Sequence, residues 1–380
     1  MSAYRKGTTY KAAGHDLITL LTQAKEIEME TIYNKLAKHL DNLPGGYPTT
    51  ESGVELRILK RLFTAPEAEL AITLSIKPET VAAIAERTDQ ESSTLSVSLE
   101  EMAKKGLIFR SYKDETVLYS AAMFVIGIWE YHVNDLDAEL VKDVNEYLPH
   151  IMKDVWSETN TKHLRVIPIS ESISQDIKIA SYEDAETLIK AQSKITVQPC
   201  ICRKEHEVLG EPCKYPLDVC FAFGAAAYFY EENKLGRSVT IEEALEILEV
   251  GKKAGLVIQP GNAQRSANIC MCCGCCCQML KNLKNFESPA EEVHSNYFAK
   301  VTEDECIGCG ECVERCHMDA ITMDDRAQIN LNRCIGCGIC IPECPTEAIQ
   351  LIAKEKSEKY VPAKFTFQAY MRMAKERGKI

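Results

Sequence analysis

Apolar residues recur at helical spacing in the first third of the chain. Leu17, Leu20 and Leu21 share one face of a helix predicted over residues 15–41, which ends at the Pro- and Gly-rich stretch 43–48. Between residues 52 and 120, the pattern predicts four short helices and then two strands. They are expected at Val54–Phe63, Pro66–Thr73, Pro78–Arg87, Ser93–Lys105, Leu107–Ser111 and Val117–Ser120. This order of elements is typical of a winged helix-turn-helix.

The middle of the chain mixes helical and strand patterns. Residues 121–160 are expected to be helical, whereas Arg165–Ile169 and Ile195–Val197 have the composition of strands. Two helix starts are predicted, because Ser181 and Thr240 are each followed three residues later by an acidic residue. The second of these helices is expected to end at Gly255.

Composition and charge narrow the class of protein. The chain has 380 residues and a net charge of −12, which argues against nucleic acid or an anionic membrane as the main partner. No run of about 18 apolar residues is present, and no apolar signal region follows the first residues. We therefore expect a cytoplasmic protein with no membrane insertion, whose acidic surface docks on a redox partner protein.

Cysteine is the residue that departs most from ordinary composition. All 18 cysteines lie after residue 199, in three groups within residues 200–220, 270–277 and 306–344. Disulfide frameworks belong mainly to small secreted domains, so these thiols are expected to stay reduced and bind metal. So many oxidisable thiolates also suggest an anaerobic cell.

The last group has the spacing of a bacterial two-cluster ferredoxin. Two copies of C-x2-C-x2-C-x3-C stand 28 residues apart, and the fourth cysteine of each copy ligates the other cluster. The first [4Fe–4S] cluster is therefore expected on Cys306, Cys309, Cys312 and Cys344, and the second on Cys334, Cys337, Cys340 and Cys316. Zinc or disulfides at this spacing are the weaker alternatives.

The two copies share their loop glycines and differ at one histidine. Gly308, Gly310, Gly336 and Gly338 should allow the tight backbone turns around each cluster. Pro345 follows the second copy, but His317 stands at the matching place in the first. His317 is either a tolerated loop residue or a side chain that tunes a cluster potential or carries a proton.

These patterns predict an α+β, multidomain protein. Its parts are an N-terminal helix and turn, a winged-helix-like and helical region, a central α/β domain with cysteines, a two-cluster ferredoxin fold and a C-terminal tail. In that order, the boundaries are 1–50, 51–160, 161–295, 296–352 and 353–380.

The other ten cysteines match no zinc motif, yet they are candidate ligands of one or more additional Fe–S clusters. They are Cys200, Cys202, Cys213, Cys220, Cys270, Cys272, Cys273, Cys275, Cys276 and Cys277. Adjacent cysteines are expected to diverge, so some of the second group must reach elsewhere, and the thiols at 200–220 are candidate partners. The ten could hold two clusters or one of unusual structure, and Cys213 and Cys220 could instead be buried apolar residues.

Basic residues follow the first pair of these cysteines. Arg203, Lys204 and His206 could bind an anionic substrate or offset the charge of a thiolate-ligated cluster. The alternative is a solvated basic turn, whose charges would interact weakly with their surroundings.

The winged-helix-like region has the wrong charge for reading DNA. Residues 51–115 hold nine basic and twelve acidic residues, and the candidate recognition helix begins with Glu91. A surface that binds phosphates should be basic. We therefore expect this region to form a homodimer or dock a protein, and nucleic acid is not an expected partner.

Four segments resemble a family of bacterial 4Fe–4S dicluster-domain proteins that are common in anaerobes. They begin at Thr50, Pro199, Cys270 and Arg315, the last three reading PCICR, CMCCGCCC and RCHMDA. The resemblance implies two [4Fe–4S] clusters and electron transfer. It implies nothing about the ten other cysteines.

Three functions fit the sequence. The first is an iron–sulfur protein that relays single electrons through two [4Fe–4S] clusters and an additional cysteine-ligated cluster, to or from a partner oxidoreductase. The second is a reductase with an unusual catalytic cluster between Cys200 and Cys277. The third is a redox-sensing winged-helix regulator. No nucleophile–base pair, phosphate loop or dinucleotide fingerprint is present.

Overall fold

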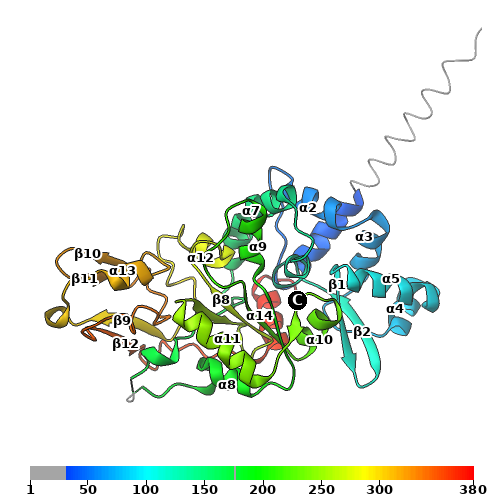
Figure 1. The fold of residues 1–380 in the computed structure, drawn as a ribbon. Helices are drawn as coiled ribbons and strands as arrows, with labels where there is room; N and C mark the ends of the chain where they lie inside the picture. Colours follow the sequence, from blue (N-terminus) through cyan, green and yellow to red (C-terminus); the bar gives the residue numbers. More distant parts are fainter. Residues whose placement is uncertain (1–30, 175–176) are drawn as a thin grey trace, which may run out of the picture.

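The computed structural model describes residues 31–174 and 177–380. Three regions follow one another across the molecule (Figure 1). The N-terminal helices and the β1–β2 hairpin lie at one end, the ferredoxin-like segment lies at the other, and a central sheet lies between them. No helix in the described part of the chain is long and apolar enough to cross a membrane.

The N-terminal region contains the helices and strands that the pattern predicts. Residues 31–42 are helical, and the rest of the helix predicted over 15–41 lies outside the described residues. The elements that follow are α2 (Val54–Leu62), α3 (Ala65–Ile72), α4 (Val81–Thr88), α5 (Ser92–Lys104), β1 (Ile108–Lys113) and β2 (Thr116–Ala121). The four helices and two strands are thus confirmed to within a few residues. The winged-helix assignment stays a prediction.

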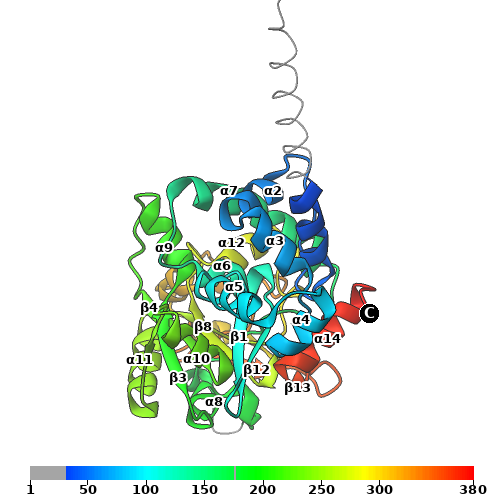
Figure 2. The ribbon, with the colours of Figure 1, turned by 90° about the vertical axis from the view of Figure 1, so that its right-hand side faces the viewer.

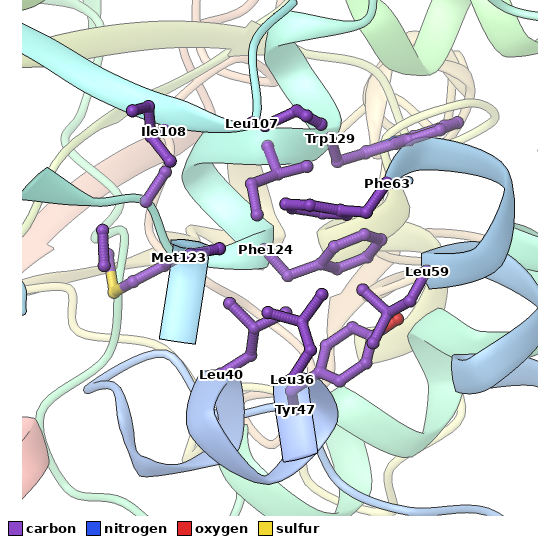
Figure 3. Packing of buried hydrophobic residues seen from close by; sticks show 14 of the residues in the cluster. Leu36, Leu40, Tyr47, Leu59, Phe63, Leu107, Ile108, Met123, Phe124 and Trp129 are labelled. Carbon is purple, nitrogen blue, oxygen red and sulfur yellow. The ribbon is translucent and has the colours of Figure 1, made fainter. Parts of the chain in front are cut away.

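An aromatic and aliphatic core holds this region together. Leu36 and Leu59 are fully buried around Tyr47, whose ring packs edge-on against Phe124 at 5.1 Å between centroids (Figure 3). The Tyr47 hydroxyl donates to the carbonyl of Glu55 at 2.8 Å, so its one polar group is satisfied. Fully burying such side chains stabilises the fold by about 1.5–3 kcal/mol each.

Residues 121–160 are helical only in part. The helices are α6 (Trp129–Tyr131), α7 (Ala138–Ile151) and the π-helical turn η2 (Met152–Trp156). In the preceding segment, Phe124–Ile128, three residues have non-helical dihedral angles. The helix prediction is wrong there, because this segment packs Phe124 into the core as a turn.

The β1–β2 hairpin is packed against the central region. Arg110 of β1 is buried and forms ion pairs of 2.6 Å with Glu100 and 2.7 Å with Glu232 of α10 (Ala225–Glu232). Tyr112 also donates to Glu232, at 2.9 Å. The hairpin therefore contacts α10 of the same chain through two of its side chains.

A five-stranded antiparallel sheet forms the centre, in the order β5-β3-β4-β8-β6. Its strands are β3 (Ile195–Pro199), β4 (Asp218–Phe223), β5 (Arg237–Ser238), β6 (Val257–Pro260) and β8 (Asn268–Cys272). The helices around it are α8 (Ala185–Lys190), α9 (Ile201–Val208), α10, α11 (Ile241–Lys253) and α12 (Gln278–Leu283). Figure 2 shows α11 and α8 on the opposite side of the sheet from α7 and α12.

Two local predictions in the centre need correction. Arg165–Ile169 is not a regular strand, because its amides bond to three different segments: Arg165 and Ile167 to β6, Val166 to His294 and Ile169 to Cys337. Only an isolated bridge between Ile167 and Ile258 joins it to the sheet. Ser181 begins only a 3-10 turn, η4 (Ser181–Glu183), after the similar turn η3 (Ser170–Ser172). The α8 cap is Asp184, which accepts from the Thr187 amide. Thr240 caps α11 as predicted.

The ferredoxin-like segment consists of two small hairpin-like sheets. Strands β9 (Tyr297–Val301) and β12 (Ile349–Ala353) pair antiparallel, as do β10 (Ile321–Met323) and β11 (Ala327–Ile329). The short helices are η5 (Glu303–Glu305) and α13 (Glu311–Arg315). Arg315 joins this segment to the end of α11 by donating to the carbonyl of Lys253 at 2.8 Å.

Residues 353–380, expected as a tail, include ordered elements. Strand β13 (Ala363–Phe365) pairs in parallel with β7 (Ala263–Arg265), and α14 (Thr366–Glu376) follows it. Arg377 then forms an ion pair of 2.6 Å with Asp41 of the N-terminal region. The end of the chain therefore connects the central and N-terminal regions.

Candidate iron–sulfur and thiolate centres

The two ferredoxin-like loops turn at glycines, as the spacing predicts. All four have positive φ angles, between 66° and 87°. At Gly336, a Cβ atom would lie 2.1 Å from the carbonyl oxygen of Tyr297, so no side chain fits there. The backbone of the loop can therefore lie directly on β9.

The eight cysteines of this segment gather in the two predicted groups. Cys312 lies close enough to Cys309, Cys306 and Cys344 for their charges to add to burial in raising the pKa of its thiol. Cys340 has Cys337, Cys334 and Cys316 as its nearest charged neighbours, and its pKa is raised in the same way. The fourth cysteine of each copy thus approaches the three cysteines of the other copy.

Backbone amides approach the sulfur atoms in both loops. Ala327 donates to Sγ of Cys306, Ala320 to Cys316 and Ala299 to Cys334, each at 3.4 Å. Such bonds favour the charged thiolate and tune the potential of any cluster it ligates.

The ten central cysteines separate into two groups. Six of them form what we call the six-thiol ring: Cys200, Cys202, Cys220, Cys270, Cys272 and Cys277. The other four form the four-thiol group: Cys213, Cys273, Cys275 and Cys276. Cys272 and Cys273 divide between the two groups, as do Cys276 and Cys277, so these adjacent thiols diverge as expected. The expectation is wrong for Cys275 and Cys276, which are adjacent but lie in the same group with their sulfurs 3.6 Å apart.

Strands and helix starts position the six-thiol ring. Cys270 and Cys272 lie two residues apart on β8, so they face the same side of the sheet, beside Cys220 on the neighbouring β4. Cys200 and Cys277 are the residues that precede the first turns of α9 and α12. Helix N-termini favour thiolates, because their free amides carry positive charge.

Each thiol of the ring contacts two others, which closes the circle. In order, the circle runs Cys200, Cys202, Cys277, Cys272, Cys270, Cys220 and back to Cys200. Hydrogen bonds from neighbouring thiols lower the pKa of every second member, to about 5 at Cys270. The three members between them, which donate those bonds, have raised pKa values.

The donor set fits an iron–sulfur centre. Cys200 and Cys277 are buried, and their thiolates would be costly to hold in so apolar a place without a metal. Amide side chains also approach two thiols of the ring: Gln259 donates to Cys277 at 3.9 Å and Asn268 to Cys270 at 3.8 Å. Neither amide belongs to a sequence motif, so only the fold identifies them.

Arg203 is buried, which excludes the solvated-turn interpretation for this residue. Its guanidinium donates to the carbonyls of Pro216 at 2.6 Å and Met271 at 3.0 Å. The nearby charges of Cys200 and Cys273 hold its pKa above the ordinary value against the opposing effect of burial. Lys204 instead pairs with Glu207 at 2.8 Å near the surface. His206 lies 3.9 Å from the carboxylate of Glu211.

A cavity of about 470 Å³ adjoins the six-thiol ring. All six ring cysteines line it, together with apolar side chains of the N-terminal region, β4, α10 and α14. Three of the thiols, Cys202, Cys220 and Cys270, are only half-buried. Glu130 also lines this space, and burial raises the pKa of its carboxyl to about 8.

The central thiols touch the ferredoxin-like segment. A Cβ atom at Gly274, between Cys273 and Cys275, would lie 2.4 Å from the carbonyl oxygen of His317. The His317 ring meets Tyr215 edge-on at 5.5 Å and binds the Gly255 carbonyl at 2.9 Å. His317 follows Cys316 directly, so the two cysteine regions are in contact at this residue.

Comparisons with known proteins agree with this geometry at the C-terminal end. The family model of the 4Fe-4S dicluster domain matches residues 305–361. These residues contain all eight cysteines of the two predicted cluster motifs. The segment is thus of the iron–sulfur class. No curated protein and no solved structure matches the chain.

Proposed function

We propose that the chain is an iron–sulfur electron-transfer protein that passes single electrons between a partner oxidoreductase and a central cysteine-ligated centre. Cys306, Cys309, Cys312 and Cys344 would hold one [4Fe–4S] cluster, and Cys334, Cys337, Cys340 and Cys316 the other. The six-thiol ring would hold an additional iron–sulfur centre. Bound clusters of this kind accept and release one electron at a time.

The contact between Gly274 and His317 carries this proposal. It brings a turn between central cysteines against the residue that follows Cys316, with no space for even a methyl group between them. An ion pair of 3.0 Å between Arg315 and Glu343 fixes α13 on the side that meets α11. The two cysteine regions are therefore held at one fixed separation, as an electron relay requires.

A free-standing regulator is less well supported. Arg110, on strand β1 of the winged-helix-like region, forms an ion pair with Glu232. A wing that binds DNA would need its basic side chains free to contact the nucleic acid. A homodimer through this region stays a prediction, as does a cytoplasmic location.

Iron and sulfide analysis tests the proposal. We expect distinctly more than about eight irons per chain after anaerobic purification, since two [4Fe–4S] clusters account for about eight. The variant Cys270→Ala/Cys220→Ala should lose the excess iron and sulfide while the EPR signals of the ferredoxin-like clusters remain. Ala226→Gly, beside the same cavity, is the control and should keep both.

Two results would contradict the proposal. One is a total of about eight irons that the double variant leaves unchanged, because the ring would then hold no iron. The other is a central centre that never becomes reduced when a one-electron donor reduces the ferredoxin-like clusters.

The cavity favours a second candidate, a reductase. An electron carrier has no need of about 470 Å³ of apolar space beside its thiols, whereas a small-molecule site does. In this function, the cavity would admit a substrate to a centre held by the ring.

A further inference from the structure

The sulfur atoms of the four-thiol group lie closer together than those of the other cysteine groups in the described residues. All four Sγ atoms lie within 4.8 Å of one another. No other set of three or more histidine, cysteine or acidic side chains among the described residues is gathered so closely. Neither the ferredoxin-like cysteines nor the six-thiol ring reaches this density.

Two segments far apart in the sequence build the group. Cys273, Cys275 and Cys276 lie in and beside the turn between β8 and α12, where the Cys277 amide bonds back to the Cys273 carbonyl at 3.2 Å. Cys213 comes from the loop between α9 and β4. Cys273 and Cys276 are buried, Cys213 is half-buried and Cys275 is exposed.

Every pair of sulfurs in the group is in contact, which defines a tetrahedron. Cys213 lies 3.9 Å from Cys273 and 3.8 Å from Cys275, and Cys275 lies 3.6 Å from Cys276. Cys276 also interacts with Cys273 and Cys213, and Cys275 with Cys273. Each of the four sulfur atoms therefore interacts with the other three.

These separations match one metal ion. Four sulfurs placed tetrahedrally at a metal–sulfur distance of about 2.3 Å are ~3.8 Å apart. In a [4Fe–4S] cluster each thiolate binds a different iron, so the four thiolates lie further apart than thiolates that share one metal. The observed sulfur–sulfur distances of 3.6 to 3.9 Å therefore favour a single ion.

We propose that Cys213, Cys273, Cys275 and Cys276 bind one transition-metal ion in a tetrahedral tetrathiolate site. A tetrahedral set of four sulfurs selects zinc or iron. Arg203 lies close to Cys273 and offsets part of the negative charge of four thiolates around a divalent ion. The site goes beyond the proposed function, which needs only the ferredoxin-like clusters and the six-thiol ring.

The site would fix the turn that meets the ferredoxin-like segment. Gly274, which contacts His317, stands between the ligands Cys273 and Cys275. Tyr215, which packs against the imidazole of His317, comes two residues after the ligand Cys213. One ion thus ties the Cys213 loop to the Gly274 turn on the face that contacts His317.

The stoichiometry of metal and sulfide tests the site in the full chain. The variant Cys213→Ala/Cys275→Ala should lose about one metal ion per chain and no acid-labile sulfide, because a mononuclear site contains none. The matched control Cys306→Ala/Cys309→Ala removes an exposed and a half-buried cysteine of the ferredoxin-like segment. It should lose up to about four irons and four sulfides together.

Spectra of the unmodified protein keep the test decisive if a variant does not fold. Support would be one zinc ion with four sulfurs at about 2.3 Å by X-ray absorption, or a mononuclear high-spin iron component in the Mössbauer spectrum. The proposal is overturned if all iron belongs to clusters and zinc is absent, or if the Cys213→Ala/Cys275→Ala variant loses sulfide with its metal. In either case the ferredoxin-like signals report separately on the proposed electron transfer.

Discussion

Arg203 is the buried cation between the two central cysteine groups. Its side chain is 2% exposed, and it binds carbonyls on two separate segments while facing thiols of both groups. In the sequence, Arg203, Lys204 and His206 all follow the Cys200–Cys202 pair, and each is an equally good candidate to offset the charge of the thiolates. Only burial distinguished Arg203 from Lys204 and His206.

We expect Arg203→Met to destabilise the protein and shift its redox behaviour. Two buried carbonyls would lose their donor, which costs about 1–3 kcal/mol each in unfolding free energy. Removing the positive charge should also lower the midpoint potential of the central centre, because the reduced state gains negative charge. Anaerobic denaturant unfolding and an EPR-monitored redox titration measure the two effects.

Lys204→Met is the matched control, because Lys204 is adjacent but its ion pair lies near the surface. It should change the unfolding free energy by less than about 1 kcal/mol. Equal stability of Arg203→Met and the unmodified protein would show that those carbonyls find other donors.

The cavity is a feature of elements packed together. Helix α10 contributes Ala226, and α14 contributes Phe367 and Tyr370. The ring cysteines come from strands β4 and β8, from α9 and from the residues that precede α9 and α12. No single segment of sequence indicates such a space. It follows from the docking of the N-terminal region and α14 on the face of the sheet that bears the thiols.

A small exogenous ligand tests whether the cavity gives access to the centre. If the reductase function is correct, cyanide should alter the EPR signal of the central centre and leave the ferredoxin-like signals unchanged. Ala226→Phe should reduce this effect at least about tenfold in apparent affinity, since the larger ring fills space that the ligand must cross.

Val250→Phe is the control for that variant, because Val250 is exposed on α11 away from the cavity. An unaltered central signal in the unmodified protein at saturating cyanide would count against an open iron and against the reductase. The electron-transfer function would be unaffected by that result.

At the scale of the whole molecule, α14 and the residues after it help to join the central and N-terminal regions. His163 lies at this junction, with its ring 6.4 Å from those of Trp156 and Tyr370 of α14. Burial lowers the pKa of His163 to about 4, and the nearby charge of Arg377 acts in the same direction. Folding therefore favours the neutral ring.

This shift predicts a loss of stability on acidification. The unfolded chain binds a proton near pH 6.5 and the folded chain only near pH 4, so the contribution is complete above pH 6.5 and falls as pH drops towards 4. His163→Gln should weaken the pH dependence by on the order of 1 kcal/mol between pH 8 and 5.5. Denaturant unfolding at both pH values measures this difference, and parallel curves for the two proteins would contradict it.

Local signals predicted the elements of the N-terminal region well. Helices α2 to α5 and the β1–β2 hairpin have caps, periodic apolar residues and a turn within their own sequence. Arg165–Ile169 was misassigned because its amides bond to three different segments instead of continuously to one neighbouring strand. Local composition cannot distinguish these cases.

The sequence by itself determined the grouping of the eight ferredoxin-like cysteines. Their spacing is short and repeated, and the loop glycines restrict the backbone, so nearby residues suffice to bring the thiols together. The ten central cysteines were different, because contacting thiols such as Cys202 and Cys277 lie 75 residues apart along the chain.

Only the tertiary structure decided how those ten divide into a ring of six and a group of four. The division depends on which face of β4 and β8 each side chain takes, and on where the Cys213 loop crosses the turn at Gly274. Strand pairing and packing fix both, and neither has a signature within a short stretch of sequence.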